Sequence, residues 1–166
     1  MVTAAAVETA RAAVAAVCDP EMPVLTIDDL GVLRDVRVDE RGVVVTITPT
    51  YSGCPAMDAI RDDIVRALAH AGFDRVSVET VLSPAWTTDW MSDAARRKLV
   101  AAGIAPPSGR ASLARSGSPV RVRLAVRCPR CGSLDTQDVS RFGATSCTAL
   151  FSCRACREPF DHVKAL

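Results

Sequence analysis

Four of the seven cysteines in this 166-residue chain are arranged in two pairs that could hold a metal ion. Each pair has C-x-x-C spacing, and about 21 residues separate the pairs. Two such knuckles facing each other supply four thiolates in a closed tetrahedron, which suits zinc and leaves no open position for catalysis. Gly132, directly after the first pair, fits a backbone position that needs a positive φ. The spacing therefore predicts a structural zinc site with four ligands: Cys128, Cys131, Cys153 and Cys156.

Other ligands and another metal stay open at this point. A rubredoxin-like iron site uses the same two pairs, so zinc and iron are not distinguished by spacing. Cys147 and His162 lie close enough in sequence to replace one of the four ligands, although packing near the site is the simpler interpretation for both. The arginines around the pairs come without an aromatic stacking platform, so a scaffold role is favoured over nucleic-acid binding.

Cys54 is the second residue whose position suggests chemistry. Pro55 suits the first position of a helix, so we expect Cys54 at or next to the N-cap. There the unpaired N–H groups and the helix dipole favour a thiolate, which predicts a lowered pKa and a better metal ligand or nucleophile. Asp58, about one turn into the helix, would act against this. A small buried cysteine that closes a strand–helix joint is the equally weighted alternative.

No complete catalytic arrangement accompanies this thiol. His70 belongs to the far end of the same expected helix, and His162 belongs to the other expected domain. The acids Asp19, Glu21, Asp28 and Asp29 could form a carboxylate cluster, but turn and capping roles explain them more simply. We therefore expect a protein that is not an enzyme by itself.

The elements that must position these residues form an α+β pattern. A helix is expected over residues 3–17 and an ordered loop over 19–31, followed by a hairpin with strands over 32–38 and 43–48. A second helix (55–70), a third strand (76–82) and a short helix (92–102) follow in that order. The order αββαβα predicts a compact α+β domain in residues 1–104.

The rest of the chain divides into a linker and a small metal-bound domain. Residues 105–119 are rich in Pro, Gly and Ser without periodicity, which is typical of a linker. Residues 120–126 alternate as a strand and lead into the first cysteine pair. The zinc ribbon is expected over residues 120–166, because so short a segment needs a metal in place of a large core.

Composition indicates in which cellular compartment the protein works and which classes of partner are disfavoured. The formal net charge is +1, which gives no overall attraction to nucleic acid or anionic lipid. No apolar stretch is long enough to span a bilayer, and the Ala-rich start carries Glu8 and Arg11 without a basic n-region. Seven cysteines without an export signal favour metal or thiol chemistry in a reducing compartment, so we expect a cytoplasmic protein.

Five further segments occur in this order along the chain: DPEMPV (19–24), DLGV (29–32), TPTYSGCP (48–55), SPAWTTDWMS (83–92) and CTALFSCRACREPFD (147–161). Together they resemble the PaaD (PaaJ) family of phenylacetate-degradation proteins. The resemblance covers nearly the whole chain except the linker and the first few residues. It implies that residues 1–104 form a SufT-like iron–sulfur assembly domain and that the tail binds zinc.

The resemblance also implies a role beside an enzyme complex. PaaD-type proteins are grouped with the ring-1,2-phenylacetyl-CoA epoxidase, an oxygenase with a di-iron subunit and an iron–sulfur flavin reductase. They are thought to serve maturation of its metal centres more than turnover. The family's reactive cysteine falls on Cys54 and its Asp-Pro-Glu motif on Asp19 and Glu21, while Cys147 falls in the tail motif.

Three functional hypotheses follow. In the first, the protein is a non-catalytic assembly factor, and Cys54 holds iron or an iron–sulfur cluster transiently. A second thiolate comes from the assembly machinery, a client subunit or a second protomer. The ribbon docks the client oxygenase or reductase. In the second, the protein is a structural subunit bound stoichiometrically to the oxygenase. A nucleic-acid-binding ribbon is the third, disfavoured by the near-zero net charge.

Overall fold

The structure is a computed structural model that describes residues 3–51, 53–107 and 125–165. Its contacts divide the chain into two units: Met1–Trp86 with Trp90–Ser92, and Thr87–Asp89 with Asp93–Leu166. No helix in the described part of the chain combines the length and the apolar character that a membrane span requires.

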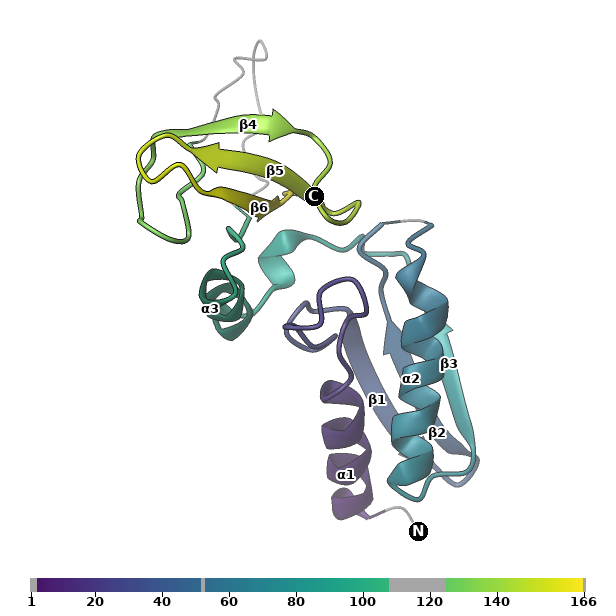
Figure 1. The fold of residues 1–166 in the computed structure, drawn as a ribbon. Helices are drawn as coiled ribbons and strands as arrows, with labels where there is room; N and C mark the ends of the chain where they lie inside the picture. Colours follow the sequence, from purple (N-terminus) through teal and green to yellow (C-terminus); the bar gives the residue numbers. More distant parts are fainter. Residues whose placement is uncertain (1–2, 52, 108–124, 166) are drawn as a thin grey trace. The chain divides into compact units, whose positions relative to one another are not determined.

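The first unit is a three-stranded sheet with two helices on one face (Figure 1). It contains α1 (Ala4–Ala15), β1 (Leu33–Asp39), β2 (Gly42–Ile47), α2 (Ala56–His70) and β3 (Val76–Thr80). β1 and β2 form an antiparallel hairpin, and β3 pairs parallel to β2 after the α2 crossover. The sheet order is therefore β1-β2-β3, with β2 in the centre.

Alternation of side chains builds the core of this unit. In β2, Val43, Val45 and Ile47 are buried, while the residues between them are half-buried. The apolar positions of α2 recur at helical spacing, and Ile60 and Ile64 are almost fully buried. The periodicities seen in the sequence thus place one face of the sheet against the helices.

The segment between α1 and β1 is the ordered loop that the sequence predicts. Leu25, Ile27 and Leu30 are among the most buried side chains of the protein. The Trp86 indole N–H donates to the Leu30 carbonyl at 2.9 Å. Gly31 has a φ of +71°, and a Cβ there would lie 2.7 Å from atoms of Trp90. The loop is thus fixed against the core by burial and by both tryptophans.

The second unit contains α3 (Asp93–Ala101) and an antiparallel ribbon of β4 (Thr136–Ser140), β5 (Thr148–Cys153) and β6 (Pro159–Val163). A short 3₁₀ turn, η1 (Thr88–Trp90), precedes α3. Ala105 forms a parallel bridge with His162, and its N–H donates to the Asp161 carbonyl at 2.7 Å. Ala105 therefore extends the edge of the ribbon sheet at β6.

The α+β class and the element order αββαβα are confirmed. The expected domain boundaries stay a prediction, because most of the expected linker, residues 108–119, lies outside the described residues. The strand expected over residues 120–126 also falls largely outside them, and the described residues 125–126 are not in a strand. The third strand ends at Thr80, two residues earlier than expected.

Candidate metal centre and the Cys54 site

The two C-x-x-C pairs form knuckles at one end of the ribbon. Cys153 is the last residue of β5. In the first knuckle, the Gly132 N–H donates to the Cys128 carbonyl at 2.9 Å. Gly132 has a φ of +75°, and Arg157, at the equivalent place after the second pair, has a φ of +64°. The positive φ predicted for Gly132 is confirmed, and the two knuckles share this left-handed position.

The four sulfurs already have the spacing of a tetrahedral site. The Cys128 and Cys156 Sγ atoms are 3.8 Å apart, and those of Cys131 and Cys153 are 3.6 Å apart. All four Sγ atoms lie within 4.8 Å of one another. A tetrahedral zinc ion with bonds of about 2.3 Å separates its sulfurs by about 3.8 Å. Two of the separations already match such an ion, and because none exceeds 4.8 Å the four thiols need only a small contraction to bind it.

Proton affinities in the cluster are uneven because the thiols share hydrogen bonds. The Cys156 N–H, together with the neighbouring sulfurs, lowers the pKa of Cys153 to about 7, against the effect of burial. The Glu158 N–H acts to lower the pKa of Cys156, but burial and the sulfurs of Cys131 and Cys153 raise it to about 12. The thiols must lose their protons when a metal binds, so metal affinity depends on pH.

A small apolar cluster supports the knuckles. Cys128 and Cys153 are buried with Val126, Ala105 and Phe160. This core is too small to hold the segment without help, so a bound metal would contribute folding free energy directly. The metal would have a structural role and not a catalytic one, because four thiolates complete its coordination shell.

Neither alternative ligand joins the four sulfurs. Cys147 lies in the β4–β5 loop, with its Sγ 2.9 Å from the Thr145 hydroxyl. His162 lies on β6, with its ring 5.2 Å from that of Phe151 in an edge-on contact, and burial lowers its pKa. Among the described residues, the four ribbon cysteines are the only cluster of three or more His, Cys, Asp or Glu that could hold an ion.

Cys54 lies directly before the N-cap of α2, as the sequence predicts. The N-cap is Pro55, and the Met57 N–H donates to the Cys54 carbonyl at 3.3 Å. Gly53 has a φ of +96°, which allows the chain to turn into the helix. All seven cysteines are within the described residues, and no disulfide joins any two of them.

The expected lowering of the Cys54 pKa is wrong. Burial raises the pKa of the thiol above its ordinary value. The Ala56 N–H and the Thr50 hydroxyl bond the sulfur and act to lower the pKa, but they do not overcome the burial. The Glu21 and Asp19 carboxylates raise it further. The helix start does act as expected, yet the surroundings of the sulfur outweigh it.

The structure therefore places the Asp19 and Glu21 carboxylates close enough to Cys54 for their charges to raise its pKa. The three side chains do not form a metal-binding cluster. Asp19 is buried, and one carboxylate oxygen accepts the N–H groups of Glu21 and Met22, each at 2.8 Å. This turn role was expected from the sequence. Thr50 was missed as a functional residue, and its only signal is its place inside the TPTYSGCP segment.

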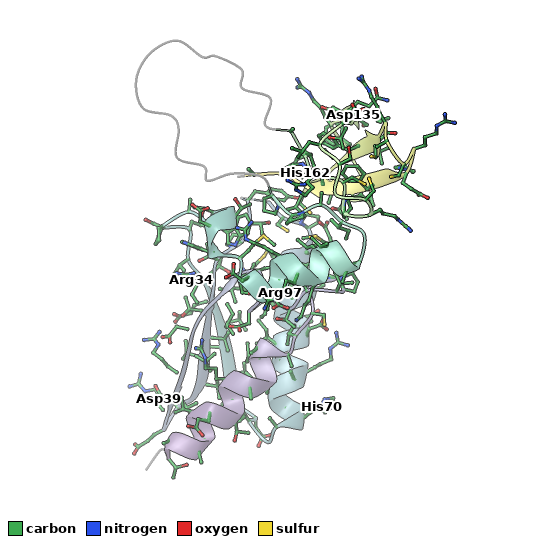
Figure 2. All side chains as sticks on the ribbon, turned by 90° about the vertical axis from the view of Figure 1, so that its left-hand side faces the viewer. Arg34, Asp39, His70, Arg97, Asp135 and His162 are labelled. Carbon is green, nitrogen blue, oxygen red and sulfur yellow. The ribbon has the colours of Figure 1, made fainter. Side chains whose placement is uncertain are left out.

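No histidine accompanies Cys54 at the start of α2. His70 is the last residue of that helix, and Figure 2 shows it at the end of the first unit where Asp39 also lies. The arrangement is a half-buried thiol beside two carboxylates and not a nucleophile with a positioned base.

The ribbon site predicts one metal ion per chain that depends on the knuckle cysteines. We expect Cys131→Ser to lose most of the metal, because three thiolates and a hydroxyl hold zinc far less tightly. Elemental analysis of the purified protein measures both the amount and whether the metal is zinc or iron. Cys147→Ser is the control and should keep the full amount; unchanged metal in Cys131→Ser would rule out this site.

The raised Cys54 pKa predicts slow alkylation of this thiol at neutral pH. Because the pKa of Cys54 is raised, the reactive thiolate forms at higher pH than in an exposed cysteine, so the midpoint of the rate profile lies higher than for the same cysteine in urea-unfolded protein. Mass spectrometry of the Cys54 peptide over a pH series measures it. Glu21→Gln should lower the midpoint by removing one negative charge; a wild-type midpoint below that of the unfolded chain would contradict the assignment.

Comparisons with known proteins agree with the two halves of this geometry. Residues 7–80 match the model of an iron–sulfur cluster assembly protein family, and residues 114–164 match that of the PaaD zinc beta ribbon domain. A solved structure from Bacillus anthracis, a domain of unknown function called DUF59, matches with a TM-score of 0.52 and 32% identity. It covers 56% of this chain and 90% of its own.

Two curated relatives extend the comparison. "Fe-S protein maturation auxiliary factor YitW" of Bacillus subtilis (strain 168) is 38% identical over 99 residues, 58% of this chain and 93% of that protein. A protein of Escherichia coli (strain K12), named as a putative subunit of 1,2-phenylacetyl-CoA epoxidase, is 48% identical over 148 residues, 89% of this chain and 86% of that protein. A SufT-like iron–sulfur assembly domain followed by a Cys₄ zinc ribbon is confirmed as the fold, and the chain belongs to the PaaD family.

Proposed function

We propose that this protein is a maturation factor for a multicomponent phenylacetyl-CoA oxygenase and assists assembly of an iron or iron–sulfur centre through Cys54. The observation that carries the proposal is the thiol at the start of α2 beside Asp19 and Glu21, in a domain related to iron–sulfur maturation factors. The client is suggested by the printed name of the E. coli relative.

The electrostatics at Cys54 favour a metal cation. Burial and, to a smaller extent, the Glu21 and Asp19 carboxylates disfavour a negatively charged thiolate, so they raise the pKa of the Cys54 thiol and keep it protonated in the absence of metal. An iron ion at the same place would draw on the same field and displace the proton. The raised pKa keeps the thiol protonated when no metal is bound, and the attraction of the carboxylates for an iron cation offsets part of the cost of displacing that proton.

The site is suited to transfer and not to storage. One cysteine cannot cage an iron–sulfur cluster, and no second thiol joins Cys54 among the described residues. The missing thiolate would come from the assembly machinery, a client subunit or a second protomer. Iron or a cluster held by such a shared set leaves readily when the client offers more ligands.

The ribbon contributes no reaction in this proposal. Its four cysteines would hold zinc in a closed shell, which supports a docking surface for the client. No catalytic residue is assigned anywhere in the chain, and we propose a non-catalytic accessory protein.

A structural subunit is the second candidate, because the E. coli relative is named as a subunit of the epoxidase. A permanent subunit would co-purify with the oxygenase in fixed stoichiometry. It would also be indifferent to the chemistry of Cys54.

The test measures iron content and epoxidase activity of the oxygenase, co-expressed with this protein, with a variant, or with neither. We expect Cys54→Ser to lower iron and activity together to the level seen without the protein, because the serine hydroxyl is a poor iron ligand. Cys18→Ser, which removes an exposed thiol of the same unit, is the matched control and should behave as wild type.

Normal iron in every co-expression would contradict the maturation role. If activity then follows physical association of the two proteins, the structural-subunit candidate is correct. If iron and activity fall together while the purified oxygenase carries no copy of this protein, the maturation role stands.

A further inference from the structure

One face of the ribbon sheet is covered at only one end by described residues. Register pairs place Phe151 opposite Phe160 and Ala149 opposite His162, so these four side chains share that face. At the knuckle end, Phe160 belongs to the apolar cluster with Val126. At the other end, the described residues leave a cavity of about 450 Å³. We call this cavity the ribbon groove; Ala149, Phe151 and His162 line it, with Arg141, Phe142 and Lys164 from the flanking segments.

Phe142 is the most exposed large apolar side chain among the described residues of this unit, at 72%. Its loop is fixed by hydrogen bonds: the Phe142 N–H donates to the Ser140 hydroxyl at 3.1 Å, and the Gly143 N–H donates to the Thr148 carbonyl at 3.0 Å. A Cβ on Gly143 would collide with the Thr148 and Asp161 side chains, so the loop packs closely on the sheet. The Phe142 side chain is therefore exposed on a loop that hydrogen bonds and packing hold in place, and not at a frayed chain end.

Lys164 ties the other side of the groove to the same loop. Its ammonium donates to the Ser146 carbonyl at 2.8 Å and lies 4.8 Å from the centre of the Phe142 ring. The Lys164 N–H also donates to the Cys147 carbonyl at 3.0 Å. The groove is thus preorganised, which lowers the entropy cost of binding a partner.

The charges around the groove favour a carboxylate. Arg141 and Lys164 supply two cations, Asp138 supplies one anion, and His162 is held neutral by burial. The whole chain has a net charge of only +1, so this is a local surplus and not part of a basic surface. Aromatic side chains and arginine are enriched in protein interfaces, so the exposed ring of Phe142 next to Arg141 favours a protein partner.

Nucleic acid fits this surface less well. Single-stranded nucleic acid binds along several aromatic platforms in a continuous basic groove. The ribbon groove exposes one prominent ring, and Asp138 lies at its side. We therefore commit to a protein partner and treat nucleic acid as an outcome of the test.

We propose that the ribbon groove docks a segment of the client protein that carries an apolar side chain next to carboxylates. The apolar side chain would cover Phe142 and Phe151, and the carboxylates would face Arg141 and Lys164. The identity of the client rests on the proposed function, whereas the chemistry of the surface does not. The assignment separates a docking site on the ribbon from the transfer site at Cys54.

The experiment is titration of purified oxygenase components with the full, zinc-loaded chain and its variants. Phe142→Ala and Arg141→Glu should each weaken binding at least about tenfold, because they remove the anchor and the charge partner. Val139→Ala is the apolar control, since Val139 is exposed on β4 and does not line the ribbon groove. Arg97→Glu on α3 is the charge control. Both controls should bind as wild type, and wild-type binding should weaken with added salt.

Several results would overturn the assignment. Binding by Phe142→Ala and Arg141→Glu equal to wild type would place the docking surface elsewhere. Absence of binding to every oxygenase component would show that the client does not occupy the groove. Phe142-dependent binding of a single-stranded oligonucleotide, or Phe142-dependent self-association, would each identify a different occupant.

The Cys54→Ser variant separates this inference from the proposed function, because in a titration without iron no metal joins Cys54 to the client and the variant should bind the client as tightly as wild type. If it also leaves the client's iron normal while Phe142→Ala still loses the client, the maturation role fails and the docking surface stands. If it yields an iron-poor client while Phe142→Ala binds normally, the docking surface is wrong and the maturation role stands.

Discussion

The charge balance at the Cys54 sulfur is the constraint on which the proposed chemistry depends. Burial and the Glu21 and Asp19 carboxylates keep the thiol protonated, while the Ala56 N–H and the Thr50 hydroxyl offset part of that effect. A site of this kind is unreactive until a cation replaces the proton. The loop that follows α1 carries both carboxylates, and its buried side chains fix the loop to the core of the first unit. The packing of that core therefore determines the charges around the Cys54 sulfur.

The ribbon depends on a different constraint, the closeness of four sulfurs over a very small core. Four Sγ atoms within 4.8 Å repel one another as thiolates unless a metal neutralises them. A metal there would fix both knuckles and, through β5 and β6, the sheet that carries the ribbon groove. The protein thus has two sulfur sites with opposite properties, one closed and structural and one open at Cys54.

The local sequence pattern predicted the helices, strands and cysteine knuckles well, but it predicted the surroundings of the Cys54 sulfur poorly. Strand alternation, the helical spacing in α2 and the paired cysteines are short-range signals, and the structure agrees with them. The pKa of Cys54 was predicted with the wrong sign because the local sequence does not show how far the sulfur is buried, and because Asp19 and Glu21 lie more than thirty positions away in the chain. The exposure of Phe142 was not predictable from the sequence for a related reason. It follows from the way Gly143 packs on the sheet, which is a tertiary contact.

The most direct test of the account is iron K-edge absorption spectroscopy on the protein with its ribbon filled by zinc and ferrous iron added without oxygen. The account predicts bound iron with a sulfur shell in the wild type and in Cys18→Ser. That sulfur shell should disappear in Cys54→Ser, leaving iron with oxygen ligands or no bound iron. An identical sulfur shell in Cys54→Ser, or a wild type that binds iron through oxygen alone, would contradict the claim that Cys54 is the iron-carrying thiol.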